Sequence, residues 1–291
     1  MKSVGIYYFS GTGNTEIVAK MIKEEFCHHQ YEVDLIRIED VLKNNMKIDM
    51  QKYDLIGIGS QVIGYAAPNI VKDFIHILPN EEARKVFIFR TAGGVAPVNY
   101  NASKSIIRKL AKKGYEVFYE RIFAISSNWI IKYDDDIIGQ LHKATKKKVS
   151  IMCEELVRGD KRILKTSMKL KVLMECLMLI CPPLMPLVGK DYIVSKECTH
   201  CGLCIKNCPV DNIYEKKDQI KFKMSCNACM RCVYACPKNA INFRFLTFFP
   251  VAGGYNIKKI LEHPCPASED AKKVVPAFFK DYVEKEIKLT P

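Results

Sequence analysis

The chain has 291 residues, a net charge of +13 and 48% hydrophobic residues. This length suits about two domains with sizeable cores, and the composition excludes a chain that stays disordered. Eight of the 13 cysteines fall in two regular motifs and five are scattered, which argues against a disulfide framework and predicts a cytoplasmic protein. The positive charge favours acidic partners or anionic surfaces, and without a recognisable motif we expect no binding to nucleic acid.

The first part of the chain alternates between apolar runs typical of buried strands and segments with helical spacing. The predicted strands are 4–9, 33–38, 53–59, 86–89 and 117–125, and the predicted helices are 14–26, 70–78, 102–112 and 134–157. This alternation predicts an α/β domain, in which helices cover both faces of a five-stranded parallel sheet.

A link rich in glycine and hydroxyl groups joins the first predicted strand to the first helix. It consists of Ser10, Gly11, Thr12, Gly13, Asn14 and Thr15. Its glycines allow a tight turn that exposes main-chain amides, its hydroxyls add donors, and the positive end of the helix dipole points at the same place. We therefore predict a phosphate site; a simple helix cap is the alternative, which the position after the first strand disfavours.

The sequence SGTGNT after a first strand resembles the FMN-phosphate loop of flavodoxins, and the resemblance extends over residues 1–160. It implies a flavodoxin-like doubly wound sheet with strand order 2-1-3-4-5 and FMN at the carboxyl ends of the strands. It also implies that two later loops hold the flavin ring. These loops comprise Ser60, Gln61, Val62, Ile63, Gly64, Tyr65, Thr91, Ala92, Gly93 and Gly94.

Aromatic residues are few near this predicted ring site. Flavodoxins often stack aromatic side chains on both faces of the ring, whereas these loops offer only Tyr65, which is equally well explained as a half-exposed loop residue. The lone Trp129 follows the fifth strand and would face either the flavin or the other domain, but a packing role is favoured.

Residues 161–189 are predicted to form an apolar and basic connecting helix. Its apolar run contains Glu175 and is expected to end at the prolines that begin with Pro182. The run is too short to span a membrane, which takes about 20 apolar residues. A buried helix that docks the two domains is the favoured interpretation, and an interfacial membrane helix or a partner-binding helix are the alternatives.

Residues 190–245 contain two runs with the spacing C-x2-C-x2-C-x3-C-P. This spacing resembles that of bacterial two-cluster ferredoxins, small α+β domains in which the fourth cysteine of each run ligates the other cluster. The ligands implied are Cys198, Cys201, Cys204 and Cys236 for one 4Fe–4S cluster, and Cys226, Cys229, Cys232 and Cys208 for the other. Structural zinc sites and disulfides fit the pattern less well.

Residues 246–291 form a C-terminal extension, with predicted helices at 257–261 and 277–287. Cys265 lies between two prolines in this extension. We expect it to be a structural cysteine rather than a spare cluster ligand.

The two halves together resemble the flavodoxin–ferredoxin fusion proteins of anaerobic bacteria and archaea. The resemblance implies an electron-transfer protein that relays electrons between an external one-electron carrier, two 4Fe–4S clusters and FMN. The alternative is an FMN-dependent oxidoreductase that reduces a quinone, a flavin or a disulfide. Gly57 and Gly59 begin a dinucleotide fingerprint, but Val62 stands where a third glycine is required, so we expect no direct NAD(P) site.

The expected partners follow from charge and from domain organisation. Because the chain is basic, an acidic redox protein such as a ferredoxin is the expected electron carrier. Peripheral membrane contact through residues 160–189 stays open. A homodimer also stays open, since it would bring the clusters of one chain to the FMN of the other.

Overall fold

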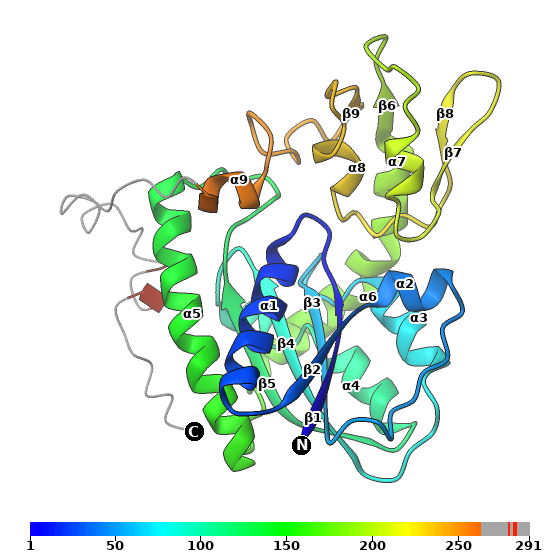
Figure 1. The fold of residues 1–291 in the computed structure, drawn as a ribbon. Coiled ribbons are helices and arrows are strands. Elements are labelled where there is room, and N and C mark those ends of the chain that lie inside the picture. The colour runs from blue at the N-terminus through cyan, green and yellow to red at the C-terminus, as the bar shows by residue number, and fades with distance from the viewer. Residues whose placement is uncertain (263–278, 280–281, 284–291) are drawn as a thin grey trace.

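The computed structural model describes residues 1–262, 279 and 282–283. A five-stranded parallel sheet with the order β2-β1-β3-β4-β5 forms the first domain (Figure 1). Its strands are β1 (Ser3–Phe9), β2 (Glu32–Arg37), β3 (Leu55–Gln61), β4 (Arg84–Ala92) and β5 (Tyr115–Ala124). The sequence-based prediction of a flavodoxin-like fold with strand order 2-1-3-4-5 is confirmed.

Helices cover both faces of this sheet because the central strands β1, β3 and β4 are largely buried and apolar on both sides. On one face, α1 (Asn14–His28) and α5 (Asp135–Arg158) enclose a core with Phe87 and Phe89. On the other face lie α2 (Ile38–Lys43), α3 (Asn69–Ile77) and α4 (Lys104–Ala111). The short helix α2 was not predicted, since a six-residue segment shows too little periodicity.

A smaller domain sits above the carboxyl ends of these strands (Figure 1). Two antiparallel strand pairs build it, β6 with β9 and β7 with β8, together with two single-turn helices. The elements are β6 (Tyr192–Val194), α7 (Leu203–Lys206), β7 (Ile213–Glu215), β8 (Ile220–Phe222), α8 (Arg231–Tyr234) and β9 (Ile241–Phe243).

The backbone of this smaller domain repeats itself. Positive φ angles recur at equivalent places in both halves, at Gly202 (+70°) before α7 and at Met230 (+64°) before α8. They recur again at Asp211 (+47°) and Asn239 (+48°) after the two helices. The duplicated cysteine spacing thus reflects a duplicated fold, the α+β arrangement expected of a two-cluster ferredoxin domain.

Helix α6 (Met168–Asp191) connects the two domains but differs from its prediction. It buries only part of one side, with Met174 1% and Val188 5% exposed, whereas Leu179 is 78% exposed. The favoured interpretation is therefore wrong about burial, although the helix contacts both domains, through Glu175 with α4 and through Val188 with the smaller domain. The helix also does not end at its prolines: it continues past Pro182 with a bend of 45°, as prolines inside helices commonly cause.

Within the described residues, no single helix combines the length and apolar character needed to cross a membrane; the two bent halves of α6 meet that criterion only when taken together.

The end of the described chain returns to the first domain. Helix α9 (Ile257–Glu262) lies beside α5 in Figure 1, and Phe279 and Tyr282 pack on α5 through Leu141. Cys265 and most of the predicted helix 277–287 lie outside the described residues. The domain limits 1–160, 161–189, 190–245 and 246–291 stay predictions.

Candidate functional site

A pocket opens at the carboxyl ends of β1, β3, β4 and β5. It brings together the three segments that sequence reasoning proposed for FMN and a fourth segment after β5. Its lining comprises Ser10, Gly11, Thr12, Asn14, Thr15, Gln61, Val62, Ile63, Gly64, Thr91, Ala92, Gly93, Ser126, Ser127, Asn128 and Trp129. Of the predicted residues, Gly13, Ser60, Tyr65 and Gly94 are not part of this lining.

The loop between β1 and α1 has the conformation of an anion cradle. Gly13 adopts φ of +104°, which glycine tolerates best, and its N–H donates to Oγ of Ser10 (3.1 Å). The first turn of α1 begins directly after it, so its main-chain N–H groups have no partner within the helix and point toward the pocket with the positive end of the helix dipole. The residues present therefore fit a phosphate group.

Hydrogen bonds between segments hold this loop in place. The hydroxyls of Thr15 and Thr91 are 2.8 Å apart, which ties α1 to the end of β4. The Asn14 amide donates to the carbonyl of Ser126 (2.9 Å) and accepts a bond from the Tyr255 hydroxyl (2.6 Å). The cradle is thus fixed before any ligand enters it.

The segment Ser126–Asn128 is part of the pocket that sequence reasoning did not assign to the site. Asn128 donates to the hydroxyl of Thr12 (2.9 Å), directly on the phosphate loop. Its position in the sequence could have predicted this role. A segment that follows the fifth parallel strand begins at the same edge of the sheet as the other loops of the pocket.

The aromatic residues near the pocket take different positions. Tyr65 is 39% exposed and lies outside the lining, as an ordinary loop residue would. Trp129 lines the pocket and also stacks on Phe249, with ring centroids 4.8 Å apart. Trp129 therefore packs against the core of the smaller domain and also faces the pocket, so both interpretations of this residue stay open.

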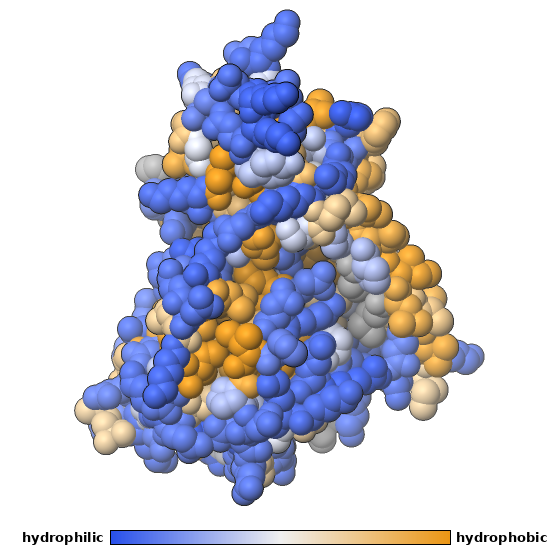
Figure 2. Space-filling model, turned by 90° about the vertical axis from the view of Figure 1, so that its right-hand side faces the viewer, coloured by the Kyte–Doolittle hydropathy of each residue, from blue (hydrophilic) through white to orange (hydrophobic). Residues whose placement is uncertain are grey.

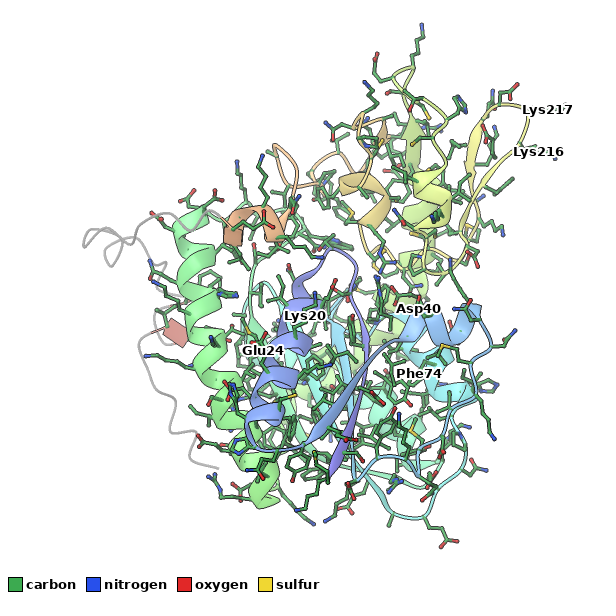
Figure 3. The ribbon with its side chains drawn as sticks, in the orientation of Figure 1. Lys20, Glu24, Asp40, Phe74, Lys216 and Lys217 are labelled. Atoms are coloured by element: carbon green, nitrogen blue, oxygen red, sulfur yellow. The ribbon has the colours of Figure 1, made fainter. Side chains whose placement is uncertain are left out.

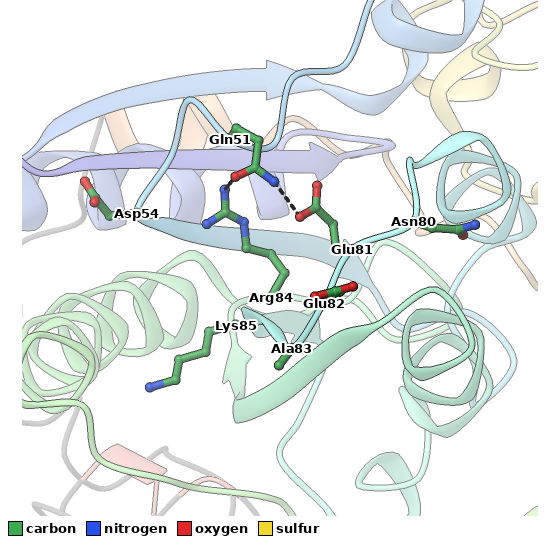
Figure 4. A pocket seen from close by; sticks show the side chains of 8 residues that line it. All are labelled: Gln51, Asp54, Asn80, Glu81, Glu82, Ala83, Arg84 and Lys85. Atoms are coloured by element: carbon green, nitrogen blue, oxygen red, sulfur yellow. Dashed lines mark hydrogen bonds between the residues drawn. The ribbon is translucent and has the colours of Figure 1, made fainter.

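A second hollow lies at the opposite end of the sheet, where β3 and β4 begin. Figure 4 shows Gln51, Glu81 and Arg84 there, and the Gln51 amide donates to Glu81 (2.7 Å). Ligands of open α/β sheets bind at the carboxyl ends of the strands, so this hollow is not a candidate for the flavin.

The first set of predicted cluster ligands, named here the distal cysteine set, consists of Cys198, Cys201, Cys204 and Cys236. All four line one apolar hollow of the smaller domain, together with Leu203 and Ile241. Cys201 is exposed and the other three are half-buried. In the described part of the chain, no three His, Cys, Asp or Glu side chains converge on a single metal ion. The four cysteines instead contribute to the lining of the same hollow.

The second set, named here the proximal cysteine set, consists of Cys208, Cys226, Cys229 and Cys232. It is less exposed, with Cys208, Cys226 and Cys229 buried. Burial raises the pKa of the Cys226 thiol to about 12, and the neighbouring Cys229 and Cys208 add to this rise. Four thiolates crowded in such a place repel one another, and a bound iron core would compensate their charge.

Main-chain N–H groups point at the sulfur atoms of both sets. Asn212 donates to Sγ of Cys208 and Ala240 to Sγ of Cys236, each over 3.2 Å. These contacts occupy corresponding places in the two halves of the domain. Hydrogen bonds to ligand sulfurs stabilise the negative charge of a cluster and tune its reduction potential.

The proximal cysteine set lies directly on the phosphate loop of the other domain. A Cβ atom placed on Gly11 would clash with the carbonyl oxygen of Cys229 and lie 3.0 Å from its Cβ. Cys229 also packs into the core formed by α2, α3 and the sheet. Gly11 is therefore required for the close approach of the two domains, in addition to any role in the loop itself.

Arg231 stabilises this contact between the two domains. Its guanidinium donates to the main-chain oxygens of Ser10 (2.6 Å) and Gly11 (3.2 Å) on the phosphate loop and of Asn207 (3.1 Å) in its own domain. It also forms a buried ion pair with Glu39 of α2 (2.7 Å). One side chain thus joins the segment between Cys229 and Cys232 to the loop that would hold the flavin phosphate.

Further bonds surround this contact. Lys43 of α2 donates to the carbonyl of Cys208 and pairs with Asp211 (2.7 Å). The Asn227 side chain caps the start of α3 by accepting from the N–H of Ile70 (3.1 Å). These bonds all lie on the side of the smaller domain that carries the proximal cysteine set.

Comparison with known proteins identifies the smaller domain. Residues 190–237 match the family model described as a 4Fe–4S dicluster domain. The formate dehydrogenase iron–sulfur subunit of Wolinella succinogenes is 43% identical over 61 residues, and the polyferredoxin protein MvhB of Methanothermus fervidus is 32% identical over 87 residues. These matches cover 20% and 29% of this chain, and the chain spans 30% and 20% of the two relatives.

Solved flavodoxins resemble the first domain. An archaeal flavodoxin is 16% identical with a TM-score of 0.38, and flavodoxin 2 of Bacillus cereus is 22% identical with a TM-score of 0.39. The matches cover 53% and 54% of this chain and nearly all of each flavodoxin. These scores are low, and the flavodoxin-like fold of the domain is defined by its strand order.

Fold and cysteine pattern together define the class of protein: an iron–sulfur protein of the electron-transfer class. More particularly, the chain combines a flavodoxin-like domain with a 4Fe–4S dicluster domain, as flavodoxin–ferredoxin fusion proteins do.

Proposed function

We propose that this chain relays electrons between an external one-electron carrier, two 4Fe–4S clusters and FMN. The observation that carries the proposal is the contact between Cys229 and Gly11, which seats a cluster-binding segment on the phosphate loop. Electron transfer is fastest between centres that are close together and held at a fixed separation. The contact lies within one chain and therefore supports a path that does not require a second copy of the protein.

The two cysteine sets suggest in which order the electron-transfer centres are arranged. The distal cysteine set faces solvent through Cys201, whereas the proximal cysteine set is buried against the first domain. An external carrier would therefore meet the distal cluster, and the proximal cluster would stand between it and the flavin. FMN would supply a centre that holds one or two electrons, and the residues described above would bind and orient it.

A binding experiment tests the cofactor. FMN should bind the purified protein more tightly than riboflavin, which has the same ring but no phosphate. We expect Thr12→Val to weaken FMN binding about tenfold or more, since a hydrogen bond to a charged group contributes about 1.5–3 kcal/mol, and to leave riboflavin binding nearly unchanged. Quenching of flavin fluorescence measures both. Equal affinity for the two flavins would contradict a phosphate cradle.

A kinetic experiment tests the relay. The anaerobic holoprotein is mixed with a limiting amount of reduced ferredoxin, and the cluster and flavin absorbance bands are followed in a stopped-flow instrument. The flavin band is expected to bleach after the cluster bands, at a rate independent of protein concentration. A rate proportional to protein concentration would place the transfer between chains, and a flavin that stays oxidised would refute the relay.

The charge of the smaller domain supports an acidic carrier. Residues 190–245 contain ten basic and five acidic residues. Lys216 and Lys217 project from the tip of the β7–β8 hairpin (Figure 3), and Lys196 and Lys238 lie exposed beside the distal cysteine set. Exposed positive charge around a redox centre increases the association rate with an acidic protein.

Reversing two of these charges is expected to slow reduction by an acidic ferredoxin. We expect Lys196→Glu with Lys238→Glu to lower the second-order rate constant about tenfold or more at low ionic strength, with a smaller effect in high salt. The matched control is Lys20→Glu with Lys23→Glu, which changes the net charge by the same amount on α1, a helix of the other domain (Figure 3). Equal slowing by the control would show that only net charge matters.

The alternative function, reduction of a small acceptor such as a quinone, a flavin or a disulfide at FMN, has less support. Cys181 and Met185 of α6 approach Gly64 at the rim of the pocket, with Met185 Sδ 3.5 Å from the position of a Cβ there. This contact narrows the approach to the predicted ring site. Steady turnover of such an acceptor under anaerobic conditions, faster than exchange with a ferredoxin, would favour the alternative.

A further inference from the structure

Helix α6 presents a continuous apolar face to solvent. At about 3.6 residues per turn, its exposed apolar side chains lie within about half of the helix circumference. The face, named here the α6 face, consists of Met168, Val172, Leu173, Leu179, Ile180, Leu184 and Leu187. In Figure 2 apolar side chains gather along the right-hand edge of the molecule, where α6 lies. Apolar surfaces of this kind usually mark binding sites.

The opposite side of α6 packs against both domains of the protein. Met174 is buried, and Glu175 pairs with Lys104 (3.5 Å) and Arg108 (3.1 Å) of α4. Near the other end, Val188 packs into the core of the smaller domain. The helix is therefore anchored at both ends with its apolar face outward, and it cannot bury that face by rotating inward.

The charges around the α6 face are almost all positive. Residues 161–190 contain six basic residues and a single acid, Glu175. That acid is paired on the anchored side of the helix. The exposed Lys165 and Lys169 stand at the start of the face. An apolar stripe flanked by lysines and free of acids matches the boundary between the headgroups and acyl chains of an anionic bilayer.

We propose that the α6 face binds peripherally to anionic phospholipid membranes, with the helix lying in the plane of the interface. Two other occupants fit less well. A second copy of the chain would bring its own lysine-rich segment to the same contact. Of the C-terminal extension, helix α9 and the described residues Phe279 and Tyr282 pack beside α5 instead. Membrane binding would hold the pocket beside Gly64 close to the lipid surface, since Cys181 and Met185 of α6 reach it.

Vesicle sedimentation of the anaerobic holoprotein tests the proposal. We expect the protein to sediment with vesicles made of equal parts phosphatidylglycerol and phosphatidylcholine, and to stay in the supernatant with phosphatidylcholine alone. The variant Leu179→Glu with Leu184→Glu should lower the vesicle affinity at least a hundredfold, because burying a leucine contributes about tenfold or more. Both side chains are exposed, so folding should not change.

Two controls make the outcome decisive. Ile77→Glu alters an apolar residue at the end of α3 that is about as exposed as Leu184 (46% and 48%), and this variant should bind vesicles as the wild type does. Sedimentation velocity without lipid reports the oligomeric state. The proposal is overturned if the wild type ignores anionic vesicles, if the double variant still binds them, or if a dimer forms that Leu179→Glu dissociates, which would assign the face to a second copy.

Discussion

Replacing Cys229 with alanine is expected to remove one cluster and leave the other. The holoprotein should contain about eight iron atoms per chain, and the variant about four, because each 4Fe–4S cluster requires all of its thiolates for stable binding. Iron and acid-labile sulfide analysis after anaerobic purification measures this directly. Cys198→Ala should give the same iron content by removing the distal cluster.

The two variants should differ in their flavin kinetics. In Cys229→Ala, reduced ferredoxin should still reduce the distal cluster, but the flavin should stay oxidised because the proximal cluster is gone. In Cys198→Ala, the entry point is lost, so reduction of the remaining cluster should itself be slow. A matched control is Cys176→Ala, which changes an exposed cysteine of α6 outside both sets and should keep about eight iron atoms. A Cys229→Ala variant that retains the full iron content would show that the ligand assignment is wrong.

Substitution of Arg231 by glutamine should have a large effect on stability. The side chains of Arg231 and Glu39 are 15% and 5% exposed, and removing one partner of a buried ion pair costs up to about 3–5 kcal/mol. Arg37 also pairs with Glu39 (3.0 Å) and should reduce that cost. The loss should loosen the contact between the domains, since the same guanidinium donates to Ser10 and Gly11. Urea titration followed by the fluorescence of the lone Trp129, which stacks on Phe249 at that contact, provides the measurement.

A surface pair provides the comparison for this prediction. Arg108 pairs with Glu175, but its side chain is 67% exposed, so Arg108→Gln should cost at most about 1 kcal/mol. Arg231→Lys keeps the charge but cannot donate to four acceptors at once. We expect its loss of stability to lie between those of Arg231→Gln and Arg108→Gln. If Arg231→Gln were no more destabilising than Arg108→Gln, the proposed role of Arg231 in docking would be refuted.

The features on which the sequence-based predictions rest are local. The SGTGNT loop and the two cysteine runs each need only a few neighbouring residues in a set order, and the alternation of strands and helices follows from periodicity. The parallel strand order then followed from resemblance. The individual flavin-site and cluster residues stay predictions, although the structure gathers most of them into two hollows and one buried group.

What the sequence did not reveal depends on contacts between distant segments. Arg231 and Glu39 are 192 positions apart, and each would pass as an ordinary surface charge in its own helix. The same applies to α6, whose apolar run predicted burial because nothing in a sequence tells which face the rest of the chain leaves uncovered. The prediction that α6 ends at its prolines was also wrong. Proline cannot donate a main-chain hydrogen bond, but a helix can bend at that position and continue.

The close approach of Cys229 to Gly11 has a consequence for the maturation of the protein. A chain that has not yet received iron would lack the clusters that organise residues 198–236, and the loop between β1 and α1 would then be uncovered on that side. If this loop holds FMN, we therefore expect FMN to bind faster to the protein without clusters than to the protein that carries them.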